Sequence, residues 1–184
     1  RGLDVSFDWL KPLANGTLLV RVIGTRTFEQ KVTLDRDPLS TLPTTDISGT
    51  VGNAVGFLSD WASAPDISAN VTATWQRGDF SLTGQMRYVD DGTIDRDRIG
   101  PDDPSFDVSL PGSVTYNTLG NYEVYSLTGT YDFTVRDQDL QFWGSIDNLT
   151  DEDPPIYGEG TGGTNAIFYN TIGREYRVGL RFNF

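Results

Sequence analysis

Acidic residues are the first candidates in this sequence for side chains that take part in chemistry, because Asp and Glu number 26. The segment DDGTIDRDRIGPDD, residues 90–103, concentrates them, and carboxylate oxygens are the ligands that Ca²⁺ prefers. The segment lacks the Asp-x-Asp-x-Asp-Gly order of an EF-hand loop, so we interpret it as a solvated acidic loop, with calcium bridging at a cell surface as the alternative. The Gly-rich segment EGTGGTN at 159–165 lacks the strand and helix context of a phosphate-binding loop. We therefore expect no cofactor and no dedicated metal site.

The residues that most enzymes use are missing. The 184-residue chain has no His and no Cys, and it carries 14 Lys and Arg against 26 Asp and Glu, for a formal net charge of -12. This composition excludes the usual zinc sites and the Ser-His-Asp and Cys-His nucleophiles. It also argues against a nucleic-acid partner, because binding phosphates requires clusters of Lys and Arg. We expect a protein that is not an enzyme.

Two arginines stand out in the last segment, EYRVGLRFNF. Arg177 and Arg181 lie on the polar side of an alternating pattern, where they could guide an anionic solute or pair with carboxylates on neighbouring strands. Successive side chains of a strand point to opposite faces, so the other side is wholly apolar. The strand could face the core of a soluble sandwich, or lipid on one side and a wet lumen on the other. The apolar positions are Tyr176, Val178, Leu180, Phe182 and Phe184.

In the segments predicted to form the regular structure of this chain, apolar and polar residues alternate with a period of two. No convincing helical period is present, and no apolar run approaches the 18 residues of a transmembrane helix. The sequence therefore predicts an all-β fold. We expect seven strands, near residues 2–10, 17–32, 66–77, 79–90, 121–134, 138–149 and 171–184.

Short and long connections alternate along the chain. KPLANG, RGD and TVRDQD are tight turns, and the long connections are 33–65, 90–120 and 150–170. This alternation predicts an antiparallel up-and-down meander with all long loops at one end and Phe184 at the other. Outer-membrane barrels have short periplasmic turns and longer extracellular loops. In the hairpin of 66–77 with 79–90, we expect Val71, Ala73, Leu82 and Met86 on one face.

Charged and aromatic residues are also distributed unevenly between the long connections and the tight turns. The long connections carry net charges of -3, -5 and -4, which account for the whole net charge, and they hold eight of the 9 prolines. Aromatic residues near strand ends are typical of the two girdles of a membrane barrel. The predicted girdle at the tight turns is Trp9, Trp75, Phe80, Phe133, Phe182 and Phe184, and the candidates for the other are Phe28, Tyr88 and Tyr125.

Two segments, GSIDNLTDEDPP and GTNAIFYNTIGREYRVGLRFNF, resemble the C-terminal end of TonB-dependent outer-membrane receptors. In that family a strand ends in Asn-Leu-x-Asp followed by Pro, and a Tyr-x-x-x-Gly-Arg-x-Tyr pattern leads into the last strand. The departures are Thr150, where Phe is common, and Asn170, where Asp is common. The matching residues are Asn148, Leu149, Asp151, Pro154, Pro155, Tyr169, Gly173, Arg174 and Tyr176.

The resemblance implies a 22-stranded barrel around a plug, in the outer membrane of a Gram-negative bacterium. Residues 1–184 would be the C-terminal segment of that barrel, without the plug, the TonB-contacting segment and the earlier strands. An odd count of seven strands agrees with a segment, because bacterial single-chain barrels have even numbers. The implied partners are outer-membrane lipid and lipopolysaccharide, TonB through the absent segment, and the barrel-assembly machinery, which would read the last strand and its terminal aromatic residue. The implied function is energy-coupled uptake of a solute, such as a siderophore, cobalamin or carbohydrate.

Two alternatives remain open from the sequence. The first is a secreted soluble β-sandwich, such as a carbohydrate-binding module that uses Trp61 and Tyr157. The second is a different barrel, such as an autotransporter translocator.

Overall fold

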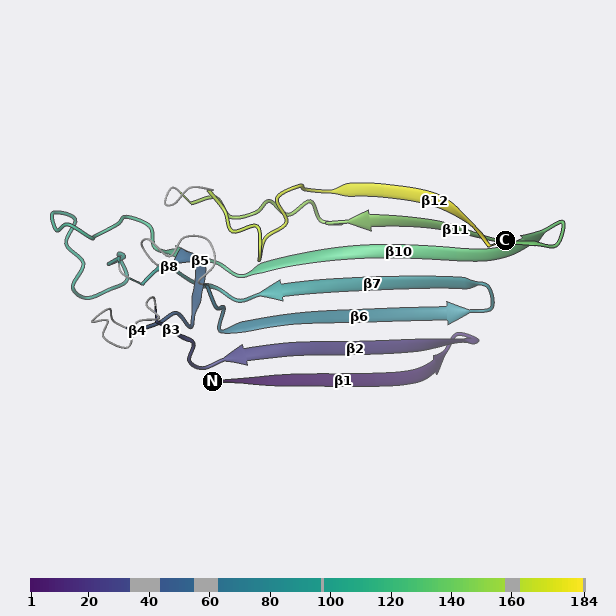
Figure 1. Ribbon diagram of the computed structural model, residues 1–184, viewed down its shortest axis with the longest axis horizontal. Helices are drawn as coiled ribbons and strands as arrows, with labels where there is room; N and C mark the ends of the chain where they lie inside the picture. The colour runs from purple at the N-terminus through teal and green to yellow at the C-terminus, as the bar shows by residue number, and fades with distance from the viewer. Residues whose placement is uncertain (34–43, 55–62, 97, 158–162, 184) are drawn as a thin grey trace.

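The molecule is built on one open antiparallel sheet of seven long strands in the order β1-β2-β6-β7-β10-β11-β12 (Figure 1). The computed structural model describes residues 1–33, 44–54, 63–96, 98–157 and 163–183. The described residues contain no helix, and hence none long and apolar enough to cross a membrane. The strands are β1 (Gly2–Leu13), β2 (Gly16–Thr27), β6 (Ile67–Arg77), β7 (Phe80–Val89), β10 (Tyr122–Val135), β11 (Gln138–Asp147) and β12 (Glu175–Asn183).

Each long strand pairs with the strands before and after it in the meander, as the sequence predicts. The hairpin of β6 and β7 is confirmed: Val71 faces Met86 across the ladder, and Ala73 and Leu82 lie on the same face by the period of two. Gly78 has a φ of 55°. This conformation suits the first central residue of a type II′ turn.

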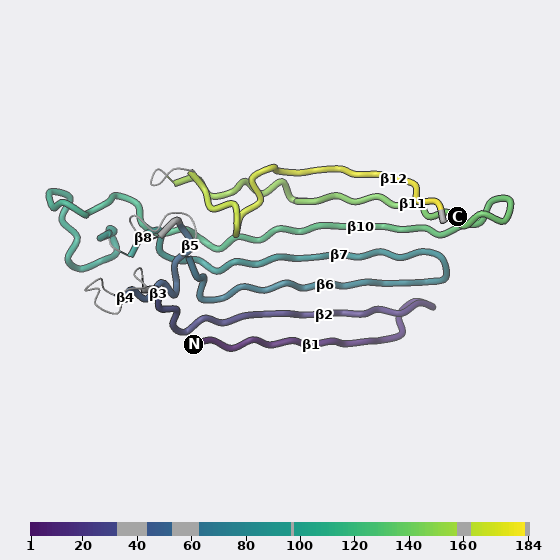
Figure 2. Tube along the Cα trace, viewed as in Figure 1, coloured from purple at the N-terminus to yellow at the C-terminus, as the bar shows by residue number. Residues whose placement is uncertain are grey.

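The other two tight turns have two central residues each in the left-handed region. Ala14 and Asn15 have φ values of 51° and 59°, and Arg136 and Asp137 have values of 50° and 61°. Positive φ at both central residues defines a type I′ turn, whose twist matches that of the flanking strands. Each of the three hairpins therefore closes with a turn of only two residues. The three turns lie together at one end of the sheet (Figure 2).

The described parts of the long connections lie at the opposite end, as expected (Figure 1). The C-terminal end of β12 lies at the tight-turn end, where Asn183 pairs with Asp139 beside the β10–β11 turn. Phe184 itself lies outside the described residues.

The long connections contain short strands that the sequence pattern did not predict. β3 (Lys31–Thr33) pairs with β4 (Thr44–Asp46). β5 (Thr50–Ala54) pairs in parallel with β8 (Gly92–Asp95), which also pairs with β9 (Thr118–Leu119). The segment 90–103 is therefore not simply a solvated loop, because β8 lies within it and Ile94 is buried.

Two predicted strand boundaries are wrong by four residues or more, and the strand expected over 2–10 continues to Leu13, into the segment predicted as a turn. The strand expected over 17–32 ends at Thr27. There the backbone N–H of Thr27 donates to the Asp66 carbonyl, and the backbone N–H of Phe28 donates to the Arg1 carbonyl. The strand expected from residue 171 begins at Glu175, because Gly173 has a φ of 84° and Ile172 donates its N–H to the side chain of Asn170. Both segments contain apolar residues, but their backbone groups bond outside the ladder.

The sheet does not close on itself. β1 pairs only with β2, and β12 pairs only with β11. The described structure therefore has two free edges and shows no closed barrel.

Candidate functional site

One face of the sheet is apolar across all seven strands, and we name it the apolar belt. None of its residues is buried, and the exposed fraction reaches 56% for Phe7 and 77% for Val178. The long strands have nine to fourteen residues, and a tilted strand needs about 9–11 to cross a bilayer. The belt comprises Val5, Phe7, Trp9, Leu18, Val20, Val22, Ala69, Val71, Ala73, Trp75, Phe80, Leu82, Met86, Tyr88, Tyr125, Leu127, Tyr131, Phe133, Leu140, Phe142, Ile146, Tyr176, Val178, Leu180 and Phe182.

Aromatic residues with polar tips stand at both ends of the belt. At the tight-turn end, the indole N–H of Trp75 donates to the Leu13 carbonyl at 2.9 Å. At the loop end, the Tyr88 hydroxyl donates to Asp90 and the Tyr125 hydroxyl donates to Glu123. Such rings suit a membrane interface, where one side is apolar and the polar tip is hydrated.

The opposite face is polar, and we name it the polar wall. Hydroxyl and amide groups fill its centre, including the bonded pair Thr74 and Thr83, and ion pairs such as Arg21 with Asp8 stand toward its edge. Away from the loop end, the apolar residues on this face include Leu10, Leu19, Ile23 and Trp143. Its polar members include Ser6, Asp8, Arg21, Thr25, Asn70, Thr72, Thr74, Gln76, Ser81, Thr83, Gln85, Arg87, Ser126, Thr128, Thr130, Asp132, Gln141, Ser145, Asp147, Glu175, Arg177 and Arg181.

Both predicted arginines lie on the polar wall. Arg177 forms ion pairs with Asp147 of β11 at 3.2 Å and with Glu175 of its own strand at 2.6 Å. Arg181 donates to the side-chain oxygen of Gln141 at 3.1 Å. The predicted assembly residues Tyr176, Val178, Leu180 and Phe182 are on the belt side of the same strand.

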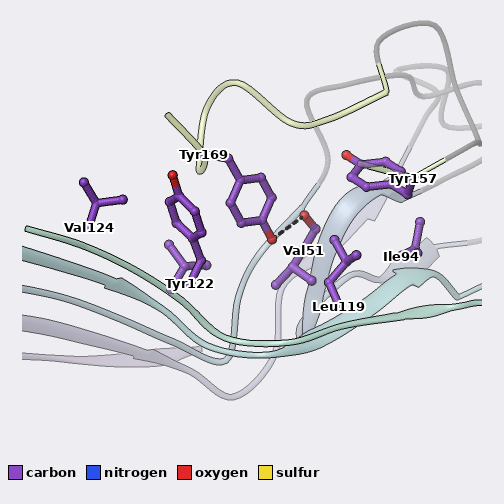
Figure 3. Close-up of a cluster of buried hydrophobic side chains, with 8 residues drawn as sticks. Val51, Ile94, Leu119, Tyr122, Val124, Tyr157 and Tyr169 are labelled. Atoms are coloured by element: carbon purple, nitrogen blue, oxygen red, sulfur yellow. Dashed lines mark hydrogen bonds between the residues drawn. The ribbon is translucent and has the colours of Figure 1, made fainter. Parts of the chain in front are cut away.

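The polar wall becomes apolar at its loop end, where the long connections fold over it. Val89, Tyr122 and Val124 occupy wall positions there, and they pack with residues of the loops in a cluster that we name the cap core (Figure 3). This is the main group of buried side chains in the described part of the chain. The cap core consists of Val51, Val89, Ile94, Leu119, Tyr122, Val124, Tyr157 and Tyr169.

Tyr169 is at the centre of the cap core. Its ring meets that of Tyr122 edge-on at a centroid distance of 5.1 Å, and its hydroxyl donates to the Val51 carbonyl at 3.2 Å (Figure 3). Burial raises the pKa of the Tyr169 hydroxyl, with a further contribution from the neighbouring Tyr157, because a low-dielectric site disfavours the phenolate. The ring therefore joins the last long connection to β5 and to the sheet as a neutral group.

The residues that carry the family resemblance form a second group of contacts, which we name the turn clamp. The Asn148 side chain bonds the backbone N–H and carbonyl of Glu152. Asp151 accepts from the backbone N–H of Arg174 at 3.1 Å and pairs with its guanidinium at 3.0 Å. The clamp therefore holds the end of β11 against the start of β12 across the long connection.

A pocket lies between the polar wall and the segment 166–172, and we name it the wall pocket. Its volume is about 480 Å³, which is within the range of small-molecule sites. Arg87 donates to the Phe168 carbonyl at 2.7 Å, and no described carboxylate forms an ion pair with it. The pocket is lined by Gln85, Arg87, Val124, Ser126, Asp147, Ala166, Tyr169, Asn170, Thr171, Ile172, Glu175 and Arg177.

The sequence pattern indicated Arg177 but missed Arg87 and the pocket itself. Arg87 is visible on the polar side of its strand, but the segment that covers it comes 81 residues later. No local pattern could pair the two. The only signal was the polar composition of that face.

Of the two aromatic residues expected to bind carbohydrate in the alternative interpretation, only Tyr157 lies in the described structure. Tyr157 is buried in the cap core, and Trp61 lies outside the described residues. In the acidic segments, Asp103 and Asp107 accept hydrogen bonds from Ser105 and Ser109, which lower the pKa of both carboxyls. Within the described ranges, no three acidic side chains converge on a point that could hold a metal ion.

A comparison with protein-family models and with curated proteins finds no match to this chain.

Proposed function

We propose that this chain forms part of the wall of a transmembrane β-barrel of the TonB-dependent receptor type, which takes up a solute across the outer membrane. The observation that carries the proposal is the apolar belt, which runs over seven consecutive strands and which no described element covers. An exposed apolar surface of this extent on a water-soluble protein would promote aggregation. Lipid contact on the belt and water on the polar wall account for both faces.

The two ends of the sheet support an orientation in the membrane. Tight turns stand at one end, and long connections with most of the acidic residues stand at the other. In outer-membrane barrels the short turns are periplasmic and the long loops are extracellular. The cap core therefore lies on the outer side, over the lumen.

The receptor type is supported by the resemblance and by the contacts of the residues that carry it. Asn148, Asp151 and Arg174 join in the turn clamp, and Tyr169 is the largest fully buried side chain among the described residues. The coding sequence upstream of Arg1 provides a direct test. A plug domain encoded there supports the proposal, and an unrelated domain contradicts it.

The soluble sandwich is not favoured by the described structure. A sandwich requires a second sheet packed on the apolar face, and the small sheets β3-β4 and β5-β8-β9 lie with the long loops instead.

Membrane insertion can be tested with single cysteines, because the chain has none of its own. Val71 and Met86 face each other on the belt, and Thr72 and Gln85 face each other at nearly the same depth on the wall. Each is replaced by Cys in the complete receptor, from which any cysteine outside residues 1–184 has been removed, and is labelled with an environment-sensitive fluorophore in lipid vesicles. We expect quenching by brominated lipid at Val71 and Met86 and by aqueous iodide at Thr72 and Gln85. Iodide quenching at all four positions would contradict the proposal.

A further inference from the structure

We propose that the wall pocket binds a small hydroxylated solute with a single carboxylate, such as a sugar acid, with Arg87 as the carboxylate-binding residue. The inference rests on the proposed function, because it takes the polar wall to face the lumen. It assigns a substrate class to that lumen.

Arg87 has the donors that such a ligand needs. A guanidinium carries five N–H donors, and the contact with the Phe168 carbonyl is made through one nitrogen. No described carboxylate forms an ion pair with Arg87. A planar guanidinium with unused donors matches a carboxylate in two parallel hydrogen bonds.

The opposite side of the pocket carries the reverse charge. Asp147 and Glu175 both pair with Arg177, so two carboxylates share one cation. That side therefore has an excess negative charge, which disfavours a second anionic group on the ligand. The separation of charge selects a monoanion and orients its carboxylate toward β7.

Neutral hydrogen-bonding groups lie between the two charged sides. Gln85 and Ser126 form the floor of the pocket, and Asn170 and Thr171 belong to the segment above it. Amide and hydroxyl groups both donate and accept, which suits the hydroxyls of a sugar ring.

The covering segment is fixed at several points. Asn165 donates to the Gly52 carbonyl, Tyr169 donates to the Val51 carbonyl, and the backbone N–H of Asn170 donates to the Tyr122 hydroxyl. The pocket is therefore formed before a ligand arrives, and little ordering cost opposes binding.

The test compares galacturonate, galactose and galactosamine, which share a ring and differ in charge, by titration calorimetry of the complete receptor, with residues 1–184 joined to the rest of its barrel, in detergent micelles. We expect galacturonate to bind most tightly. In Arg87→Gln, galacturonate should bind about 10- to 100-fold more weakly, as for a lost hydrogen bond to a charged group, whereas galactose binding should change little. The control is Arg21→Gln on β2, which removes a wall arginine outside the pocket and should leave all three affinities unchanged.

A second variant guards against misfolding, because Arg87 also holds Phe168. Ser126→Phe fills the floor of the pocket without touching that contact, and it should abolish binding of galacturonate and galactose together. The proposal is overturned if the wild type binds none of the three sugars, or does not prefer galacturonate. It is also overturned if Arg87→Gln retains that preference. The fluorophore experiment above needs no ligand, so a barrel that inserts but fails this titration refutes only the substrate class.

Discussion

Tyr169 joins three parts of the molecule that are distant in the sequence. Its ring packs on Tyr122, and its hydroxyl bonds the backbone of Val51. Because burial raises the pKa of this hydroxyl, the folded cap holds the phenolic proton more tightly than the unfolded segment does. As the pH rises above the ordinary tyrosine pKa of about 10, the unfolded segment loses the proton and the folded cap keeps it. The stabilising contribution is fully present below that pH and is lost as the pH rises further toward the raised pKa.

We predict that Tyr169→Phe makes the cap less sensitive to alkaline pH. The variant loses one hydrogen bond, which costs about 0.5–1.5 kcal/mol, but it has no proton to lose at this position. Near-ultraviolet circular dichroism of the aromatic rings, followed from about pH 8 to about pH 11, should show wild type losing its signal at lower pH than the variant. Tyr131→Phe, at an exposed tyrosine near the tight-turn end of the sheet, serves as the control. Identical pH profiles for wild type and Tyr169→Phe would show that deprotonation of Tyr169 does not cause the alkaline sensitivity of the cap.

Asp151 and Arg174 connect two segments that the resemblance identifies only as sequence motifs. The carboxylate of Asp151 accepts from both the backbone and the guanidinium of Arg174. We predict that Asp151→Ala and Arg174→Ala each lower the free energy of unfolding, and that a double-mutant cycle gives a coupling of about 0.5–1 kcal/mol, since the pair is partly exposed. Urea unfolding of the complete receptor inserted in vesicles measures all three variants. If the changes in the free energy of unfolding of the two single variants add up to that of the double variant, the ion pair contributes nothing to stability.

The residues of the turn clamp were predictable from the sequence as a motif, but the reason for their spacing was not. Asn148 and Asp151 have positive φ values of 55° and 59°, which form a turn that ends β11 and aims Asp151 at Arg174. The contact of Arg87, in contrast, could not be predicted even as a motif. Its partner, the Phe168 carbonyl, is a backbone atom, and a backbone carbonyl leaves no signature in a residue pattern.

At the scale of strands, the long hairpins follow directly from alternation and turn chemistry. Each long strand has one apolar and one polar face, and a shift of one residue would exchange them, so the register is strongly specified. The short strands β5, β8 and β9 could not be predicted in this way. They have two to five residues each, and they are held by the packing of Val51, Ile94 and Leu119 in the cap core.

The pairing of β11 with β12 depends on a glycine beneath a large ring. Gly179 lies opposite Trp143, and a Cβ on Gly179 would stand 2.6 Å from the indole. We predict that Gly179→Ala destabilises the protein by about 1–3 kcal/mol, as overpacking does in a tight site. Gly84→Ala is the matched control, because a Cβ on Gly84 would meet nothing within 4 Å.

Urea unfolding of the complete receptor in vesicles measures both glycine variants. We expect Gly84→Ala to have little effect or to stabilise slightly, since alanine loses less backbone entropy than glycine. Equal destabilisation by the two substitutions would mean that the Trp143 contact does not constrain β12.

At the scale of the whole molecule, the distribution of buried residues is the reverse of that in a soluble domain. The belt is apolar and uncovered, whereas the buried cluster lies at the loop end on the otherwise polar side. The cap core therefore covers one end of the polar wall, and no described element covers the belt.

The two free edges of the sheet lead to the last prediction. β1 and β12 have twelve and nine residues, and each pairs on one side only. Open sheet edges do not occur in the hydrocarbon of a membrane, because each unpaired backbone group there costs several kcal/mol. We therefore predict that residues 1–184, refolded alone in detergent, form oligomers or aggregates through these edges and no monomeric barrel. Light scattering coupled to size-exclusion chromatography measures the mass of the protein component. A β-rich, urea-resistant monomer would show that the seven strands close by themselves, and would contradict the proposal that β1 and β12 pair with further strands of a larger barrel.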